Sequence, residues 1–360
     1  MSRNNIENLL LKSLIEDLDI LNGYPNCTNF TEFEKTFNNS TSSMKESLTD
    51  DSSNSDTSVI YPKSQTVFFT KKDIFNALAT QKSSIFLQGT IREMSPFEIS
   101  NFIKEIKGHF EKIMKDKNGN YLCSDLFKAC IPSQRIEIIK EIFSKFDDLS
   151  IHDFATHPIQ TLIELAQTQE EINLITSSLS TPTKIIKVSL NPNGSYVIQK
   201  IIMNIQEQKR QNFNMYLLSI IPLLSQDMYG VCTSKKFVSF THTPFLIQGI
   251  IKVITNNFFA IAQNQYGNYL IQYILELWWN KIELCYIKKI IEKYFFQLST
   301  NQYASHISES YIKMLSDNER QIFLSVILQK GLYFTLLKDK YGVYVMNKLS
   351  NSIMTKKGKL

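Results

Sequence analysis

Glycine and proline are scarce in this chain of 360 residues, which holds 11 glycines and 9 prolines. Each makes up about 3% of the sequence, below the ~7% and ~5% that are typical of proteins. Because β-sandwiches need many turns, this scarcity disfavours them and favours a mostly helical fold. No run of 18 apolar residues occurs, so the sequence predicts no membrane-spanning segment.

Signals for targeting, metal binding and catalysis are also missing. The apolar N-terminal stretch is broken by acidic residues at 16, 17 and 19, unlike a signal peptide. The five cysteines, without CxxC spacing, indicate a reducing compartment and argue against disulfides or zinc, and Cys123 and Cys130 are predicted to be inert buried thiols. No GxSxG, HExxH, P-loop or GxGxxG motif occurs, and His152 and His157 miss the i, i+4 spacing of helical metal ligands. We therefore expect no enzyme activity, no cofactor and no metal.

Charge divides the chain into two parts. Residues 1–64 contain 5 Lys and Arg against 10 Asp and Glu, net −5, and the remainder contains 34 against 24, net +10. Residues 4–22 have the spacing of an amphipathic helix, and 38–58 are largely Ser, Thr, Asn and Asp. We predict a mostly disordered acidic leader over 1–64, with a short helix at 4–22 that is either transient or partner-binding. A basic folded domain is predicted over 65–360.

From residue 65 onward the sequence repeats itself. Segments such as PNGSYVIQ (192–199) and QYGNYLIQ (265–272) place a small residue before a similar run, and eight copies fit this frame. The residue after the small one is number 84, 120, 156, 195, 231, 268, 305 and 343, so the steps range from 36 to 39 residues. Apolar residues in each copy have helical spacing. The sequence therefore predicts an all-α fold, a curved α-solenoid of eight repeats of about 37 residues.

Each copy presents three side chains near the start of one helix: the residue after the small one, the next residue, and the residue four after the first. On a helix, residues i and i+4 share one face, and residue i+1 projects about 100° around the axis. In the sixth copy these residues are Asn268, Tyr269 and Gln272. Two amides beside an aromatic ring suit a nucleic-acid base, which the amides hydrogen-bond and the ring stacks on.

In this pattern the chain resembles the Pumilio/PUF family of single-stranded RNA-binding proteins, over about residues 70–350. The resemblance implies that each repeat reads one base and that the RNA runs antiparallel to the protein. The RNA-binding residues that it implies, from copy one to copy eight, are Ser84, Ile85 and Gln88; Asn120, Tyr121 and Ser124; Thr156, His157 and Gln160; Ser195, Tyr196 and Gln199; Val231, Cys232 and Lys235; Asn268, Tyr269 and Gln272; Ser305, His306 and Glu309; and Val343, Tyr344 and Asn347.

The resemblance also implies a base for each copy. In copy seven, Ser305 and Glu309 flank His306 and imply guanine, because a carboxylate accepts hydrogen bonds from guanine N1–H and N2–H. Asn268 and Gln272 in copy six imply uracil. The hydroxyl and glutamine pairs of copies one, three and four imply adenine. The implied target is 5′-(U)-G-U-N-A-A-(U)-A-3′, a UGUA-like element in which the bracketed bases have incomplete readers.

Three copies depart from the family pattern. In copy two Ser124 replaces a glutamine, which weakens its assignment to uracil. Copy five has Val231 and Lys235, with neither an amide pair nor a ring, and is predicted to tolerate any base, with Lys235 contacting a base carbonyl or only a phosphate. Copy eight has Val343 where asparagine is usual. Lysines 200, 236 and 348 each follow a copy's last reader and are predicted to line a phosphate track.

The resemblance implies a cytoplasmic regulator that binds 3′ untranslated regions of mRNA. It would repress messages or promote their decay by recruiting effector proteins such as deadenylase or repressor complexes, and we expect no membrane partner. One alternative is a ribosome-biogenesis protein of the PUF group that binds structured RNA with little sequence choice, which Val231 and Val343 favour. The other is a HEAT- or armadillo-like protein–protein adaptor, which predicts no pattern at the triplet positions.

Overall fold

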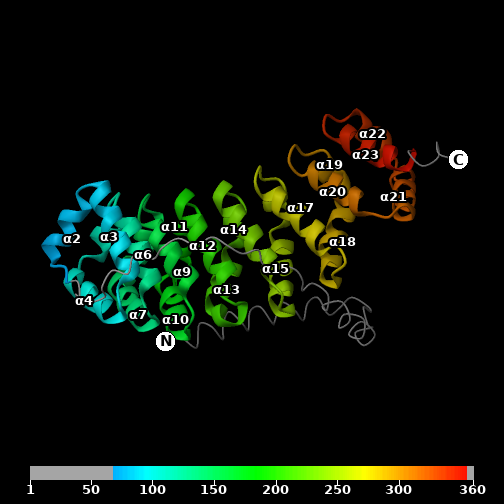
Figure 1. Cartoon of the computed structure of the whole chain (residues 1–360). Helices are drawn as coiled ribbons and strands as arrows, with labels where there is room; N and C mark the ends of the chain where they lie inside the picture. Colours follow the sequence, from blue (N-terminus) through cyan, green and yellow to red (C-terminus); the bar gives the residue numbers. More distant parts are fainter. Residues whose placement is uncertain (1–67, 355–360) are drawn as a thin grey trace, which may run out of the picture. The chain divides into compact units, whose positions relative to one another are not determined.

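The computed structural model describes residues 68–354, and within this range the chain forms helices and no strand (Figure 1). The predicted leader over 1–64 and its helix at 4–22 lie outside the described residues. Figure 1 shows the helices following one another in sequence order from α2 to α23. The all-α solenoid predicted from the sequence is therefore confirmed for the described part of the chain.

The helices fall into three groups that recur along the chain. The inner helices begin with the predicted triplets and are α3 (Gln81–Glu93), α6 (Gly119–Ala129), α9 (Thr156–Leu165), α12 (Pro192–Asn204), α14 (Met228–Ser239), α17 (Gly267–Trp278), α20 (Ser305–Met314) and α23 (Gly342–Met354). The short helices that precede most of them are α2 (Lys71–Leu78), α5 (Phe110–Met114), α8 (Phe146–Ile151), α11 (Pro182–Ser189), α16 (Phe258–Ala262), α19 (Phe295–Ser299) and α22 (Leu332–Lys338). The outer helices are α4 (Pro96–Ile106), α7 (Pro132–Ile142), α10 (Gln169–Ser178), α13 (Gln211–Leu224), α15 (Pro244–Asn256), α18 (Cys285–Lys293) and α21 (Asp317–Gln329), with 3-10 turns η2 (Phe143–Lys145), η3 (Glu207–Arg210) and η4 (Ile282–Leu284) between them.

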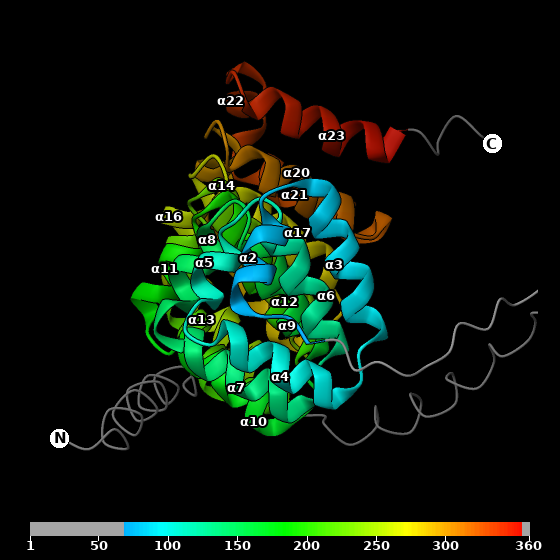
Figure 2. The ribbon, with the colours of Figure 1, turned by 60° about the vertical axis from the view of Figure 1, so that its left-hand side comes forward.

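The inner helices form one continuous row. Each packs against the next in the order α3, α6, α9, α12, α14, α17, α20, α23. Figure 2 brings α3 and α6 to the front of this row and shows the outer helices α7 and α10 lying together below them. Because each inner helix packs on the next one, equivalent positions on successive helices are brought next to each other. Residues that are about 37 apart in the sequence thus become neighbours in space.

The core explains why single repeats need their neighbours. On α17 the apolar residues Leu270, Ile271, Ile274 and Leu275 are fully buried, at the spacing of one helical face. Buried apolar side chains of the other inner, short and outer helices join them in one cluster that runs along the row. Each fully buried aliphatic side chain stabilises the fold by about 1.5–3 kcal/mol relative to exposure. A repeat gains this stabilisation only by packing on the next one.

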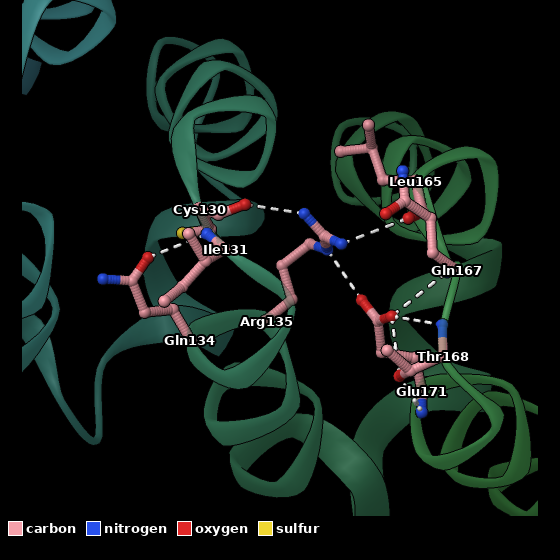
Figure 3. Close-up of polar contacts among 8 residues, drawn as sticks. All are labelled: Cys130, Ile131, Gln134, Arg135, Leu165, Gln167, Thr168 and Glu171. Atoms are coloured by element: carbon pink, nitrogen blue, oxygen red, sulfur yellow. Dashed lines mark hydrogen bonds and ion pairs between the residues drawn. The ribbon is translucent and has the colours of Figure 1, made fainter. Parts of the chain in front are cut away.

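A buried ion pair joins two neighbouring outer helices. The Arg135 Nε on α7 donates to Glu171 Oε1 on α10 at 2.7 Å, and the two side chains are 5% and 1% exposed. The guanidinium also donates to the carbonyl oxygens of Cys130 and Leu165, at 2.6 and 3.2 Å, near the ends of α6 and α9. Figure 3 shows this cluster, in which backbone N–H groups just before α10 hold the other Glu171 oxygen. The pair therefore ties together four helices of two successive repeats.

Two further features of the described residues bear on function. No helix in the range 68–354 is long and apolar enough to cross a membrane, and no group of three or more His, Cys, Asp or Glu in this range is arranged to hold a metal ion. Cys123 and Cys130 are buried, as predicted. Burial raises the pKa of the Cys130 thiol to about 12, and it raises the pKa of Cys123 as well. Neither thiol is therefore a ready nucleophile.

Candidate nucleic-acid interface

The inner helices share a capping arrangement that fixes where each one starts. A side chain three residues before the small residue accepts hydrogen bonds from the backbone N–H groups at the helix start. Asp116 Oδ1, for example, accepts from Asn118 N and Gly119 N, both at 2.8 Å. Equivalent bonds are made by Asn191, Asp227, Asn264, Asn301 and Asp339. Sequence reasoning overlooked these caps, although an Asn or Asp at a fixed distance before the small residue was visible in these copies.

The small residue is required by a close backbone approach. A Cβ atom at Gly119 would lie 2.3 Å from the carbonyl oxygen of Ile113, six residues earlier, and one at Gly267 would lie 2.3 Å from the equivalent oxygen of Ile261. In copy one, Ser83 occupies this slot and its hydroxyl donates to the carbonyl oxygen six residues earlier, at 2.7 Å. The short helix therefore packs directly on the start of the inner helix. This contact sets the frame in which the triplet side chains project.

The three triplet positions have different exposures. The second side chain is exposed in every copy, and the four tyrosines at this position are between 53% and 65% exposed. The third member of the triplet lies four residues after the first and is called the fifth position. Its side chain is partly exposed in copies one to seven and exposed in copy eight. The first side chain is buried in copies one to seven. It is therefore less accessible to a ligand than the second and fifth side chains. In copies two and six the asparagine at this position donates to carbonyl oxygens of the turn before its own helix.

Hydrogen bonds link the first and fifth positions, as the i, i+4 spacing predicts. Gln272 Nε2 donates to Asn268 Oδ1 at 2.8 Å in copy six. Gln88 Nε2 donates to the Ser84 hydroxyl at 3.1 Å, and copy three has the equivalent bond from Gln160 to Thr156 at 3.2 Å. In these three copies the buried first side chain is therefore joined to the partly exposed fifth one. The polar groups of one copy converge on one place, beside the exposed second side chain.

Copy two contains a buried acceptor without a partner. Asn120 Nδ2 donates to the carbonyl oxygens of Asp116 and Lys117, at 3.0 and 2.6 Å, so its Oδ1 faces away from them. That Oδ1 is buried and has no hydrogen-bond partner in the structure. Ser124, which replaces the expected glutamine, is too short to supply one and donates to the backbone oxygen of Asn120 at 3.0 Å. A ligand that donates a hydrogen bond here would satisfy the acceptor.

Copy seven has an acidic reader between two basic groups. Glu309 Oε1 lies 3.7 Å from His306 Nδ1, and Glu309 Oε2 lies 3.8 Å from Lys348 Nζ on the next inner helix. The Glu309 side chain is 24% exposed, so it is accessible without being fully solvated. The carboxylate has room to accept two parallel N–H groups, because each of its oxygens can accept more than one hydrogen bond.

Copies five and eight have valine at the first position, so neither offers a polar side chain there. Val231 is buried, and the exposed Cys232 thiol lies 3.5 Å from the carbonyl oxygen of Met228. Lys235 Nζ lies 4.8 Å from the centre of the Tyr273 ring, a cation–π contact. In copy eight the Tyr344 ring is exposed, so the surface for stacking is present.

The lysines of the predicted phosphate track have contacts of their own. Lys200 forms an ion pair with Glu164 on α9. Lys236 Nζ lies 5.8 Å from the centre of the Phe240 ring, and Lys348 lies near Glu309. A phosphate would have to compete with these contacts. The phosphate track therefore stays a prediction.

Fold and surface together define an α-helical repeat protein that presents a row of polar pairs beside exposed, mostly aromatic side chains. Four segments, residues 109–143, 184–212, 257–278 and 294–328, match the Pumilio-family RNA-binding repeat. The chain thus contains repeats that match the PUF family, and the match describes an RNA-binding repeat and not an enzyme.

Curated relatives and solved structures agree with the repeat match. Pumilio homolog 12 of Arabidopsis thaliana is 25% identical over 278 residues, which cover 76% of this chain and 46% of the relative. Pumilio domain-containing protein C6G9.14 of Schizosaccharomyces pombe is 27% identical over 57% of this chain and 30% of the relative. The chain thus spans less than half the length of these relatives.

Among solved structures, the RNA-binding domain of yeast Puf5p bound to SMX2 RNA has the same fold, with a TM-score of 0.67 and 21% identity over 80% of this chain and 88% of that one. The Puf3 RNA-binding domain bound to a Cox17 RNA 3′ UTR recognition sequence has a TM-score of 0.58 and 25% identity, over 79% of this chain and 85% of that one.

Proposed function

We propose that this chain binds single-stranded RNA along its row of inner helices, one base to each of eight helices. The observation that carries the proposal is the repeated geometry of the triplets. On each inner helix an exposed second side chain lies beside the first and fifth positions, and successive inner helices pack in one row. Such a row places similar binding positions at regular intervals, as a single strand with regularly spaced bases requires.

The contributions of stacking and base-edge bonding can be separated. Each aromatic–base stack contributes roughly 1–3 kcal/mol and depends little on the base. A base-edge contact with two hydrogen bonds discriminates against a wrong base by roughly 1–3 kcal/mol. The second positions therefore supply affinity, while the first and fifth positions select the base. We propose that the preferred element is UGUA-like, with guanine at the second base opposite copy seven and uracil at the third base opposite copy six.

Glu309→Gln tests this register. We expect the variant to lose roughly 5- to 100-fold of its preference for guanine at the second base, because an amide cannot accept both guanine N–H groups as the carboxylate does. Preference at the other bases should persist. Dissociation constants for RNAs that vary only at the second base, measured by fluorescence anisotropy, give the result.

Glu276→Gln is the matched control, because Glu276 is an exposed acid on α17 that pairs with Lys313 at 3.5 Å and is not a reader. It removes the same charge and should leave guanine preference unchanged. Guanine preference that is unaltered in Glu309→Gln would refute the register.

We further propose that the chain acts in the cytoplasm on 3′ untranslated regions and recruits deadenylase or repressor complexes. Support comes from its match to the Pumilio-family repeat and from the 3′ UTR sequence bound by the similar Puf3 domain. A reporter message with the UGUA-like element in its 3′ untranslated region should be repressed when the chain is present. Replacing the GU of the element should abolish that repression, and equal repression of both reporters would contradict the proposal.

A second candidate function is binding of structured RNA with little sequence choice. The apolar first residues Val231 and Val343 favour it, because neither can hydrogen-bond a base edge. Selection from a random RNA pool separates the candidates. Enrichment of a motif with a central GU supports sequence-specific binding, structured RNAs without a motif support the second candidate, and no retention supports a protein–protein adaptor.

A further inference from the structure

In three successive pairs of inner helices, the fifth-position reader of one helix is contacted by a side chain of the next helix. The contacting residue always follows directly after the fifth position of its own copy. We propose that these residues are positioning residues, which orient the preceding fifth-position side chain and, where that side chain selects a base, as in copies six and seven, strengthen the selection. The pairs are Lys235 with Tyr273, Gln272 with Ser310, and Glu309 with Lys348.

The chemistry of each contact matches its reader. The Tyr273 ring lies against the Lys235 ammonium, and its hydroxyl is held by Ser239 at 2.6 Å. The Ser310 hydroxyl lies 3.1 Å from Gln272 Oε1. All three contacts are attractive. An aromatic ring attracts the Lys235 ammonium, a hydroxyl donates to the Gln272 amide oxygen, and the Lys348 ammonium attracts the Glu309 carboxylate. Base selection by one repeat, which rests on the proposed function, would then depend on the next repeat as well.

The pair on α17 and α20 gives the sharpest case. Asn268 Nδ2 donates to the backbone oxygens of Asn264 and Gln265 at 2.9 and 3.0 Å, so Asn268 Oδ1 must face Gln272. Gln272 Nε2 donates to that oxygen, which leaves Gln272 Oε1 toward Ser310. The amide is therefore anchored at both ends. It keeps one free N–H and one free lone pair, in a fixed order, for a base.

That fixed order distinguishes uracil from cytosine. Uracil presents an acceptor at O4 and a donor at N3–H, whereas cytosine presents a donor at N4 and an acceptor at N3, the reverse order. An amide that flips by 180° exchanges its donor and acceptor and suits cytosine instead. A flip would place Gln272 Oε1 against Asn268 Oδ1, which has no proton to donate, so Asn268 sets the order of donor and acceptor. The Ser310 hydroxyl donates to Oε1 and so holds the amide in that orientation. We infer that Ser310 strengthens the choice of uracil by copy six.

The residue directly after the fifth position does not contact the preceding helix's reader in copy three, and this copy supplies a matched control. Thr161 is the corresponding residue of copy three, but its hydroxyl donates to His157 O on its own helix, at 3.2 Å. It therefore lacks the contact with the preceding reader that Ser310 makes. Removing the Thr161 hydroxyl changes the same position on an inner helix without disturbing the reader of copy two.

The test compares wild-type chain, Ser310→Ala, Ser310→Thr and Thr161→Ala on the RNA 5′-UGUAAAUA-3′ and on the same RNA with cytosine at the third base. We expect Ser310→Ala to lower the uracil-to-cytosine affinity ratio about two- to tenfold, the effect of one hydrogen bond. Ser310→Thr keeps the hydroxyl and should restore the ratio, and Thr161→Ala should leave it unchanged. Melting temperatures close to wild type show that the variants fold.

The outcomes separate this inference from the proposed function. If wild-type chain binds both RNAs equally, uracil reading by copy six is refuted, and the positioning role with it. If wild-type chain prefers uracil and Ser310→Ala keeps the full ratio, only the positioning role is refuted. A loss that is equal in Ser310→Ala and Thr161→Ala would also refute it.

Lys348→Met gives an independent check with RNAs that carry guanine or adenine at the second base. We expect up to about a fivefold loss of guanine preference, the scale of a partly exposed ion pair, and recovery with Lys348→Arg. Lys200→Met is the control, because Lys200 pairs with Glu164 and not with a reader. It should lower affinity for both RNAs equally. An unchanged guanine preference in Lys348→Met would overturn the role of Lys348.

Discussion

The buried pair of Arg135 and Glu171 offers a demanding test of how the repeats hold together. In Glu171→Ala the Arg135 guanidinium, 5% exposed, keeps its two carbonyl partners but loses its only negative partner in the cluster (Figure 3). An unpaired buried charge destabilises by about 3–5 kcal/mol. The backbone N–H groups before α10 also lose their acceptor, so we expect a loss at the upper end of that range.

The double variant Arg135→Met with Glu171→Leu should recover the part of the loss that comes from the unpaired Arg135 charge, because removing both charges of a buried pair is often nearly neutral. The part that comes from the backbone N–H groups of Gln167 and Thr168 should remain, because leucine cannot accept their hydrogen bonds. The control is Glu170→Ala. Glu170 pairs with Lys140 across the same two helices, at 2.8 Å, but the side chains are 57% and 56% exposed. An exposed pair of this kind contributes about 0–1 kcal/mol.

Hydrogen exchange is the suitable assay, because repeat proteins open locally and a single unfolding transition does not describe them well. Amide protection in α7 and α10 should fall in Glu171→Ala and return in part in the double variant. Equal protection in Glu171→Ala and Glu170→Ala would refute the reasoning that the buried pair joins these repeats.

The pH dependence of the same pair has a definite sign. Burial alone would raise the pKa of Glu171, but hydrogen bonds from Thr168, Arg135 and Gln167 outweigh burial and hold it below the ordinary value. A carboxyl whose pKa falls on folding stabilises the fold above its unfolded-state pKa, about 4.3 for Glu. This stabilisation is lost as the pH falls through the folded-state value. The stability difference between wild type and Glu171→Ala should therefore narrow below about pH 4.

Three further predictions follow from the inner helices. Tyr269→Ala should weaken binding by roughly 5- to 100-fold for every base opposite copy six, since stacking is sequence-tolerant, and a loss confined to uracil RNAs would contradict this. Gly267→Ala should destabilise by about 1–3 kcal/mol in thermal melts because its Cβ meets the Ile261 oxygen, whereas Gly89→Ala, with nothing within 4 Å, should stabilise by about 1 kcal/mol. Ser124→Gln should sharpen uracil preference at the seventh base in anisotropy titrations, by supplying a donor to the buried Asn120 Oδ1, and an unchanged preference would show that this acceptor has no part in reading.

Most of the fold could be predicted from the sequence because its determinants are local and repeated. The small residues at 119 and 267 mark where the short helix meets the inner helix, and the caps at 116 and 264 mark the helix start. Both signals recur about every 37 residues, so one copy supports the next. The apolar spacing then separates the buried face from the exposed second position. The caps were not predicted, because the prediction rested on the residues that follow the small one.

The contacts between readers and the following helix could not be predicted in the same way. Ser310 and Gln272 are 38 residues apart, and their contact depends on how two inner helices pack, which no local pattern in either repeat specifies. The sequence therefore identifies which side chains can meet a base, while packing between repeats decides how each of them is held. A code that assigns each base from the triplet of one repeat omits these contacts between repeats. We expect its base assignments to be least accurate where residues such as Ser310 and Lys348 contact a reader of the preceding repeat.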